Sequence, residues 1–209
     1  MSEVSDPIFA RIASRYDLIN RILSLGQEKY WRARGIERLG SGTVLDLGSG
    51  TGDTDFGDRD VVGLDPVVEM LSLSPVSKRV VAVGERLPFR DHSFGGVFSA
   101  FVFRNLSSVE ETLAEIARVL EPGESAVVVD LARPANPLLR VIHRLGTAVL
   151  LPLVGLIFAS APREYWYLHK SLDSLPPPEH LFANSPLAPT DLWRMGPFGF
   201  VYGAELTKR

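Results

Sequence analysis

The sequence predicts an α/β protein with a mostly parallel sheet and helices on both faces. Short apolar, β-branched runs recur along the middle of the chain, and helical segments separate them. A glycine-rich turn follows the first run directly. The strands of a parallel sheet are buried on both faces, so they read as continuous apolar runs. We expect strands over residues 43–47, 61–65, 80–83, 96–100 and 126–131.

The clearest helix lies between the last two runs, in "SSVEETLAEIARVLEPG". A serine precedes it as the N-cap, and Glu110 and Glu111 in the first turn favour the positive end of the helix dipole. A Pro-Gly pair follows its last turn. The apolar residues recur at helical spacing, at Val109, Leu113, Ile116, Val119 and Leu120.

The ends of the chain differ from this core. Residues 7–38 predict two helices, the first stopped by Gly26, which would form an N-terminal cap outside the sheet. After the core we expect an apolar helix over 136–159, a proline-rich irregular lid or linker over 171–189, and a closing strand in 198–209. The predicted organisation is one domain, with a cap over 1–40, a core over 41–135 and a substrate-side part over 136–209.

Composition excludes several classes of function. The 209 residues are 45% hydrophobic and 22% charged, with a formal net charge of -3, so no basic excess indicates a nucleic-acid partner. The absence of cysteine excludes disulfides, thiolate metal sites and cysteine nucleophiles. No other cluster has metal-ligand spacing, so we expect no metal. The N-terminus has early acidic residues and no apolar core, unlike a signal peptide, which favours the cytoplasm.

One uncharged run, from Gly146 to Ala161, raises the question of a membrane. It is shorter than the ~20 residues of a spanning helix and contains Pro152. Arg140, His143 and Arg144 precede it. A buried helix or one lying at a membrane surface is therefore favoured over a spanning helix.

A glycine loop, Gly48, Gly50 and Gly52, follows the first strand. A dinucleotide-binding fingerprint would place its third glycine at position 53, which is Asp53, and the Gly-Lys-Ser/Thr of a P-loop is absent. Asp53, together with Asp46 two residues before the loop, would repel a pyrophosphate. The loop therefore favours a ligand with a cationic end.

"VLDLGSGTGD" resembles motif I of the class I S-adenosylmethionine methyltransferases. Further segments look like the menaquinone/ubiquinone C-methyltransferases of the UbiE type, over most of residues 8–172. "RYDLIN" and the pair Arg104–Asn105 are the more specific marks of this resemblance. The similar segments are 9–32, 84–94, 103–123 and 165–172. The resemblance implies a Rossmann-like class I methyltransferase fold with S-adenosyl-L-methionine as cofactor.

The resemblance also implies which residues hold the cofactor. The loop would wrap its methionine part, Asp65 would hold the ribose hydroxyls, and Val83–Gly84 would lie beside the adenine. Val83 stands where relatives have Asp or Asn, with Glu85 as a substitute, and Ala100 stands in place of a common Ser. The full predicted set is Asp46, Gly48, Ser49, Gly50, Thr51, Gly52, Asp65, Pro66, Met70, Val83, Gly84, Glu85 and Ala100.

Two connections are shorter than in the similar proteins. "DTDFGDRD" can make one helical turn at most, because Gly57 interrupts it, and the helix after Asp65 must stop before Pro75. The family's C-terminal hairpin also looks reduced to one strand. We interpret this as kept loop contacts under trimmed covering helices, which fits a thermophilic source or a non-catalytic homologue.

Methyl transfer to a quinol carbon requires alignment, exclusion of water, and removal or stabilisation of a hydroxyl proton. The resemblance places Arg104 at the substrate, where it would stabilise the oxyanion or order a water acting as base, with Asn105 orienting it. A surface arginine beside a helix is the alternative. Tyr16 and Asp17 would close over the site from the cap, and Tyr165 and His169 would line the substrate side.

The leading functional prediction is a C-methyltransferase for a demethylmenaquinol-type polyprenyl quinol. A methyltransferase for another small lipid or phenolic acceptor, and a non-catalytic S-adenosylmethionine-binding homologue, stay open. The expected partner is a lipophilic quinol, with no nucleic acid. The apolar region 138–161 would line a groove for the polyprenyl tail and rest on a membrane, or pack in a homodimer. The expected location is cytoplasmic, with membrane association through that helix.

Overall fold

The computed structural model describes residues 21–22, 24–154, 156, 170–173 and 175–208. Most of the first predicted helix lies outside these residues, as do Tyr16, Asp17, Tyr165 and His169. Gly26 confirms the predicted stop, because its φ is +75° and its N–H donates to the carbonyl of Arg21 at 2.8 Å.

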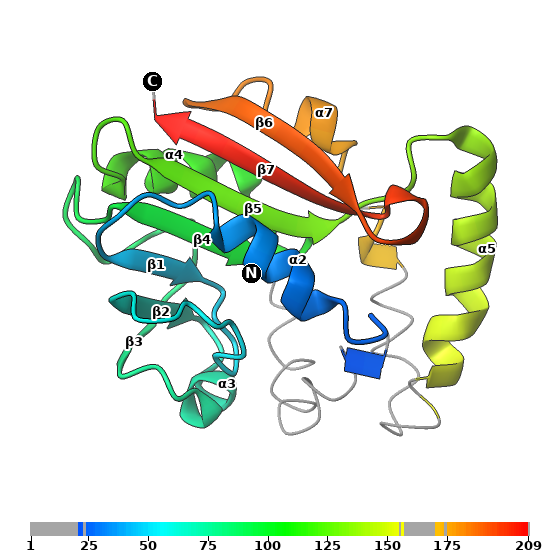
Figure 1. Cartoon of the computed structure of the whole chain (residues 1–209), viewed down its shortest axis with the longest axis horizontal. Coiled ribbons are helices and arrows are strands. Elements are labelled where there is room, and N and C mark those ends of the chain that lie inside the picture. The colour runs from blue at the N-terminus through cyan, green and yellow to red at the C-terminus, as the bar shows by residue number, and fades with distance from the viewer. Residues whose placement is uncertain (1–20, 23, 155, 157–169, 174, 209) are drawn as a thin grey trace.

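The sheet has seven strands in the order β3-β2-β1-β4-β5-β7-β6 (Figure 1). Strands β1 to β5 pair in parallel, and β7 runs antiparallel between β5 and β6. The parallel sheet and four of the five predicted strands are confirmed. The bounds are β1 Val44–Leu47, β2 Val61–Asp65, β3 Lys78–Val81, β4 Gly96–Ala100, β5 Ser125–Leu131, β6 Leu187–Met195 and β7 Val201–Lys208.

The third strand was predicted two residues too late. β3 lies at the sheet edge and begins with the exposed residues Lys78 and Arg79, so its apolar run does not mark its limits. Its register is fixed by β2 instead, with Val62 opposite Lys78 and Asp65 opposite Val81. An edge strand with charged residues resists pairing with other chains, which accounts for the polar start.

Helices cover both faces of the sheet, as predicted (Figure 1). On one face α4 packs Leu113 and Ile116 against the strands, and on the other α2 packs Trp31 against Phe98 and Val129. Ser108 caps α4 by accepting a hydrogen bond from the N–H of Glu111. The helix bounds are α2 Glu28–Ile36, α3 Val68–Leu73, α4 Val109–Val119, α5 Pro137–Val154 and α7 Pro178–Leu181.

The prediction that both connections are short is confirmed. Residues 53–60, between β1 and β2, form no helix, and α3 has six residues and ends at Leu73. Phe56 fills part of the space that a helix would cover, since its buried ring meets Phe98 edge-on with centroids 5.6 Å apart. One aromatic side chain therefore shields this part of the sheet.

The prediction of a single closing strand was wrong, because β6 and β7 form a complete antiparallel hairpin. The proline-rich stretch hid β6. Pro189 lies inside β6, which tolerates proline because it is the edge strand, and the register shifts between Pro189 and Asp191. The predicted lid also contains the short helix α7.

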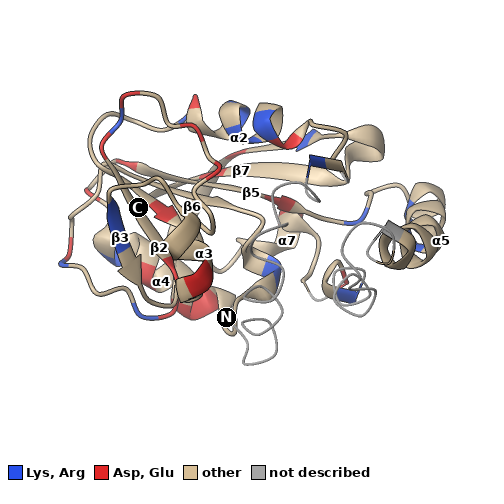
Figure 2. Ribbon diagram, turned by 90° about the horizontal axis from the view of Figure 1, so that it is seen from below, with Lys and Arg blue, Asp and Glu red and all other residues tan. Residues whose placement is uncertain are grey.

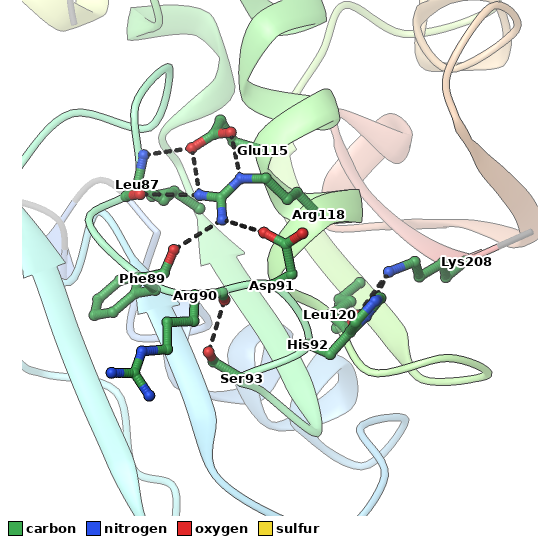
Figure 3. A network of polar contacts seen from close by, with 10 residues as sticks. All are labelled: Leu87, Phe89, Arg90, Asp91, His92, Ser93, Glu115, Arg118, Leu120 and Lys208. Atoms are coloured by element: carbon green, nitrogen blue, oxygen red, sulfur yellow. Dashed lines mark hydrogen bonds and ion pairs between the residues drawn. The ribbon is translucent and has the colours of Figure 1, made fainter.

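A network around Arg118 on α4 holds the loop after β3 (Figure 3). Arg118 donates to the carbonyls of Leu87 and Phe89 and pairs with Asp91 and Glu115. Glu115 in turn accepts the N–H of Leu87 at 2.7 Å. The loop that leads from Gly84 towards β4 is therefore fixed to α4 by charged hydrogen bonds.

Helix α5 stands at one end of the molecule, away from the sheet (Figure 1). It begins at Pro137, one residue after the predicted start, and is described to Val154. Arg133 donates to Thr147 at 2.9 Å, and His143 stacks on Phe200 with centroids 5.3 Å apart, which ties the helix to the core. No helix in the described part of the chain is long and apolar enough to cross a membrane.

Candidate functional site

The glycine loop follows β1 at the carboxyl edge of the sheet, and each of its three glycines has a positive φ. The N–H of Gly48 donates to the carbonyl of Leu64 at 2.7 Å, so the loop starts beside the end of β2. A Cβ on Gly48 would collide with the side chain of Val102. The loop therefore requires glycine both for its backbone angles and for the segment after β4 to approach it.

Asp65 ends β2 beneath this loop and is 6% exposed. Its Oδ2 accepts the N–H of Gly50 at 3.0 Å, and its Oδ1 accepts the N–H of Val67 at 2.8 Å. An ionised carboxylate accepts several hydrogen bonds through its two oxygens. Asp65 thus fixes the loop and presents a negative charge at its rim.

Asp46 is the second buried carboxylate of the site and is 2% exposed. Within the described residues its Oδ2 has no hydrogen-bond partner. Burial raises the pKa of Asp46 to about 7, while the charge of Arg32 acts to lower it and that of Asp65 to raise it. A buried carboxylate with an unpaired oxygen fits a cationic ligand group, as the loop composition predicted.

Arg32, on α2, is a site residue that the sequence did not reveal. Its Nη1 donates to Thr54 Oγ1 at 2.5 Å, and its guanidinium lies 5.3 Å from the ring centroid of Phe101. Phe101 follows β4 with a φ of +66°, a strained conformation for a residue with a side chain. Phe101 comes two residues before the short turn Phe103–Asn105, which carries Arg104.

The structure also places the other predicted cofactor residues around this edge. Ser49, Thr51 and Met70 are buried, as is Ala100 at the end of β4. Pro66 and Val83 are half-buried. The buried Gly84 approaches α4 so closely that a Cβ there would press on Thr112.

Glu85 is engaged with the backbone before α4. Its Oε1 accepts the N–H groups of Ser107 at 2.7 Å and Ser108 at 3.2 Å. Partial burial acts to raise the pKa of Glu85, but backbone hydrogen bonds, including those from Ser108 and Ser107, lower it below its ordinary value. Its role at the adenine remains an expectation from the resemblance, alongside this structural one.

Arg104 is buried, with its side chain 6% exposed, so the surface-arginine alternative is wrong. Its Nη1 pairs with Oδ1 of Asp130, the penultimate residue of β5, at 2.5 Å. Asn105 is also buried, and its Nδ2 donates to the carbonyl of Phe101 at 3.4 Å. A guanidinium held by a buried carboxylate is a fixed positive charge at the carboxyl end of β4.

Arg104 lines a cavity of about 140 Å³, which we name the Arg104 cavity. It lies past the end of β5, between the residues that lead to α5, the segment before α7, and β7. The sequence did not predict Asp130 or Tyr202 at this place. An acidic residue near the carboxyl end of a buried strand, in "VVVDL", was the available signal. The lining residues are Arg104, Leu131, Ala132, Arg133, Arg140, Ser171, Leu172, Asp173, Leu175, Pro176, Pro177, Leu181 and Tyr202.

Among the described residues, no group of three or more His, Asp or Glu side chains could hold a metal ion. The buried charged groups at this edge of the sheet include two carboxylates at the glycine loop and the Arg104–Asp130 pair. The edge therefore offers negative charge on the loop side and a paired guanidinium on the cavity side.

Comparison with known proteins identifies the family. The model of the ubiE/COQ5 methyltransferase family matches residues 2–184. The chain belongs to this family. A demethylmenaquinone methyltransferase of Deinococcus radiodurans is 38% identical over 191 residues, covering 83% of this chain and 79% of the relative. The Thermus thermophilus enzyme of the same name is 33% identical over 193 residues, covering 84% and 88%.

Solved structures of methyltransferases share the fold. An S-adenosylmethionine-dependent methyltransferase of Thermotoga maritima superimposes with a TM-score of 0.63 at 16% identity, covering 98% of this chain and 99% of that one. A geranyl diphosphate C-methyltransferase of Streptomyces coelicolor gives 0.54 at 12% identity, covering 87% and 79%. The predicted Rossmann-like methyltransferase fold is confirmed.

Proposed function

We propose that this ubiE/COQ5-family protein transfers a methyl group from S-adenosyl-L-methionine to a ring carbon of a demethylmenaquinol-type polyprenyl quinol. The main support is that an acidic glycine loop and a buried arginine held by a carboxylate lie at the same edge of the sheet. Membership of the family, and relatives named demethylmenaquinone methyltransferase, support the substrate class.

The loop residues fit this cofactor. The unpaired Oδ2 of Asp46 can receive an ammonium group, and the ribose hydroxyls would donate to the carboxylate of Asp65. The positive-φ glycines leave room for close approach of the backbone. The cofactor supplies an electrophilic methyl group carried on a sulfonium.

The chain's own contribution to the chemistry is orientation and charge. Arg104 faces the acceptor and stabilises the negative charge that its oxygen gains as the hydroxyl proton leaves. Asp130 holds the guanidinium in place, and Val102 and Phe101 set its segment against the glycine loop. Tyr16 and Asp17 as a closing flap, Asn105 as an orienting residue, and Tyr165 and His169 at the substrate remain part of the proposal.

The alternatives separate in one assay. With labelled S-adenosylmethionine, the purified protein should label a demethylmenaquinol and leave simple phenols and catechols nearly unlabelled. Labelling of simple phenols at a similar rate would favour a general phenolic acceptor. Binding of the cofactor with no labelling of any acceptor would favour a non-catalytic homologue.

Asp46→Asn is predicted to weaken binding of S-adenosylhomocysteine about tenfold, because a charged hydrogen bond to the ammonium is worth roughly 1.5–3 kcal/mol. The product carries the same ammonium as the cofactor and cannot react. Calorimetry at pH 8 measures the change. An unchanged affinity would show that Asp46 does not contact the ammonium.

The same substitution should stabilise the free protein at high pH. With its pKa raised to about 7 from 3.8, Asp46 holds a proton in the folded state that it lacks when unfolded, so stability falls as pH rises through this window. About three pKa units correspond to roughly 2–4 kcal/mol. The melting temperature should therefore fall more between pH 5 and pH 8 for the wild type than for Asp46→Asn. An equal fall in both proteins would contradict this.

We also propose that α5 meets the membrane from which the quinol is taken. Its exposed apolar residues recur at intervals of three or four positions, and the helix carries Arg140 and Arg144 but no acidic residue. In Figure 2 the ribbon of α5 is accordingly tan and blue. A stripe of leucines with basic neighbours fits an anionic lipid surface. The exposed apolar residues of this region are Leu138, Val141, Ile142, Leu145, Val149, Leu150, Leu153 and Leu156.

The double substitution Leu145→Glu/Val149→Glu should lower binding to phosphatidylglycerol-containing vesicles at least tenfold, because each buried aliphatic side chain contributes about 1.5–3 kcal/mol. Co-sedimentation measures the bound fraction. Leu73→Glu, at an exposed position on α3, is the matched control and should bind like the wild type. If the wild type does not bind the vesicles but forms a dimer, and the double substitution dissociates that dimer, the apolar stripe belongs to a homodimer interface.

A further inference from the structure

Two buried polar atoms beside Arg104 have no hydrogen-bond partner among the described residues. They are Oη of Tyr202 and Oδ2 of Asp130, whose residues are 2% and 0% exposed. The two residues lie directly opposite each other in the β5–β7 ladder. Buried polar atoms are nearly always paired in native proteins, so an unpaired donor close to an unpaired acceptor indicates a place for a polar ligand atom.

Tyr202 is one of the residues that line the Arg104 cavity, and Asp130 is not. Oδ1 of Asp130 accepts from Arg104 at 2.5 Å and from the N–H of Leu131 at 2.7 Å, so the carboxylate is held from two sides. Arg104 itself lines the cavity. Asp130 is therefore a positioning residue for the guanidinium, and Tyr202 is a group that can touch a ligand.

The hydroxyl of Tyr202 is a hydrogen-bond donor throughout the neutral range. Burial raises its pKa well above the ordinary value of 10.0, and the charge of Asp130 adds to this, against the opposing charges of Arg104 and Arg194. A phenolic hydroxyl and a guanidinium on one wall both donate hydrogen bonds. Their natural partner is an oxygen that carries, or gains, negative charge.

The other charged residues on the cavity wall bind one another or the backbone. Arg133 pairs with Asp173 through two hydrogen bonds of 3.0 and 2.9 Å, and Arg140 donates to the carbonyls of Pro134 and Ala135. The remaining wall is largely apolar, with Leu131, Leu175 and Leu181 among its residues. At about 140 Å³, the cavity compares with engineered cavities of about 150 Å³ that take one benzene ring.

We propose that the Arg104 cavity is the subsite for a hydroxyl-bearing aromatic ring, and that Tyr202 contacts this ring by donating a hydrogen bond to its oxygen beside Arg104. The inference rests on the proposed function for the identity of the ring, a quinol. It adds a substrate-contacting residue on β7, in the C-terminal hairpin. The family match ends at residue 184, before this hairpin. The ring oxygen completes the pairing of Tyr202.

The test compares 1-naphthol with naphthalene, two probes that differ by one hydroxyl. Each is titrated into the full chain loaded with S-adenosylhomocysteine, and binding is followed by fluorescence. The wild type should prefer 1-naphthol at least tenfold, and Tyr202→Phe should reduce this preference at least fivefold. Tyr30→Phe, at an exposed tyrosine on α2, is the matched control and should keep the preference. An equal preference in wild type and Tyr202→Phe would overturn the proposal.

Two further measurements separate this inference from the proposed function. Tyr202→Phe should keep its melting temperature and its affinity for S-adenosylhomocysteine, since it removes a hydroxyl that has no hydrogen-bond partner within the described part of the chain. Methyl transfer to a demethylmenaquinol with unchanged kcat/KM in Tyr202→Phe would refute the subsite alone. The protein could instead prefer 1-naphthol in a way that depends on Tyr202, yet transfer no methyl group to any quinol. That combination would support the subsite and refute the proposed function.

Discussion

Arg104→Met is expected to lower kcat for methyl transfer at least a hundredfold, the loss typical of removing one group that stabilises a developing oxyanion. It should also lower the melting temperature by roughly 10 °C. Removal of one partner from a buried ion pair costs about 3–5 kcal/mol, because Asp130 is left charged and unpaired, and each kcal/mol corresponds to about 2–4 °C at this chain length. Steady-state kinetics and thermal melts measure the two effects.

The double variant Arg104→Met/Asp130→Leu separates chemistry from stability. It removes both charges and replaces them with apolar groups, so the melting temperature should recover most of the loss. Activity should stay at the level of the single variant. Recovery of activity together with stability would show that the guanidinium is needed only to neutralise Asp130, and its proposed role at the oxyanion would fail.

Asp65→Ala is expected to weaken binding of S-adenosylhomocysteine at least tenfold. Two losses combine here, since the carboxylate would bond the ribose hydroxyls and already holds the N–H groups of Gly50 and Val67. Charged hydrogen bonds are worth roughly 1.5–3 kcal/mol each. Calorimetry measures the change, with Asp60→Ala as a control at an exposed aspartate that pairs with Lys78 on the surface.

Binding of adenosine, which carries the ribose but no ammonium, separates a direct ribose contact from an effect through the glycine loop. If Asp65→Ala binds adenosine as well as the wild type does, the carboxylate does not hold the ribose, and the loss arises from the glycine loop. A parallel loss for adenosine and S-adenosylhomocysteine is the predicted result.

The sheet and its covering helices were predictable because their signals are local. β1, β2, β4 and β5 are continuous apolar runs, and α4 combines a serine cap with helical spacing. β6 was missed because its edge position lets it contain Pro189 and polar residues, so no local pattern marks it. The limits of β3 depend on pairing with β2, which a single sequence does not display.

The site divides in the same way. The glycines and the two aspartates lie in one short stretch with a recognisable order, so their place at the ends of β1 and β2 could be predicted from sequence. Arg104 was found through the resemblance, but its buried partner Asp130 comes from another strand. Tyr202 and Arg32 reach the site only through the packing of the hairpin and α2, which depends on contacts far apart in the chain.

The most direct test is the product formed from a demethylmenaquinol and S-adenosylmethionine carrying a deuterated methyl group, analysed by fragmentation mass spectrometry. We predict one deuterated methyl per molecule, retained on the ring fragment after the polyprenyl tail is lost, which places it on carbon when the product is oxidised to the quinone. A methyl found on oxygen, or no labelled product while the cofactor is bound, would contradict C-methylation of a quinol.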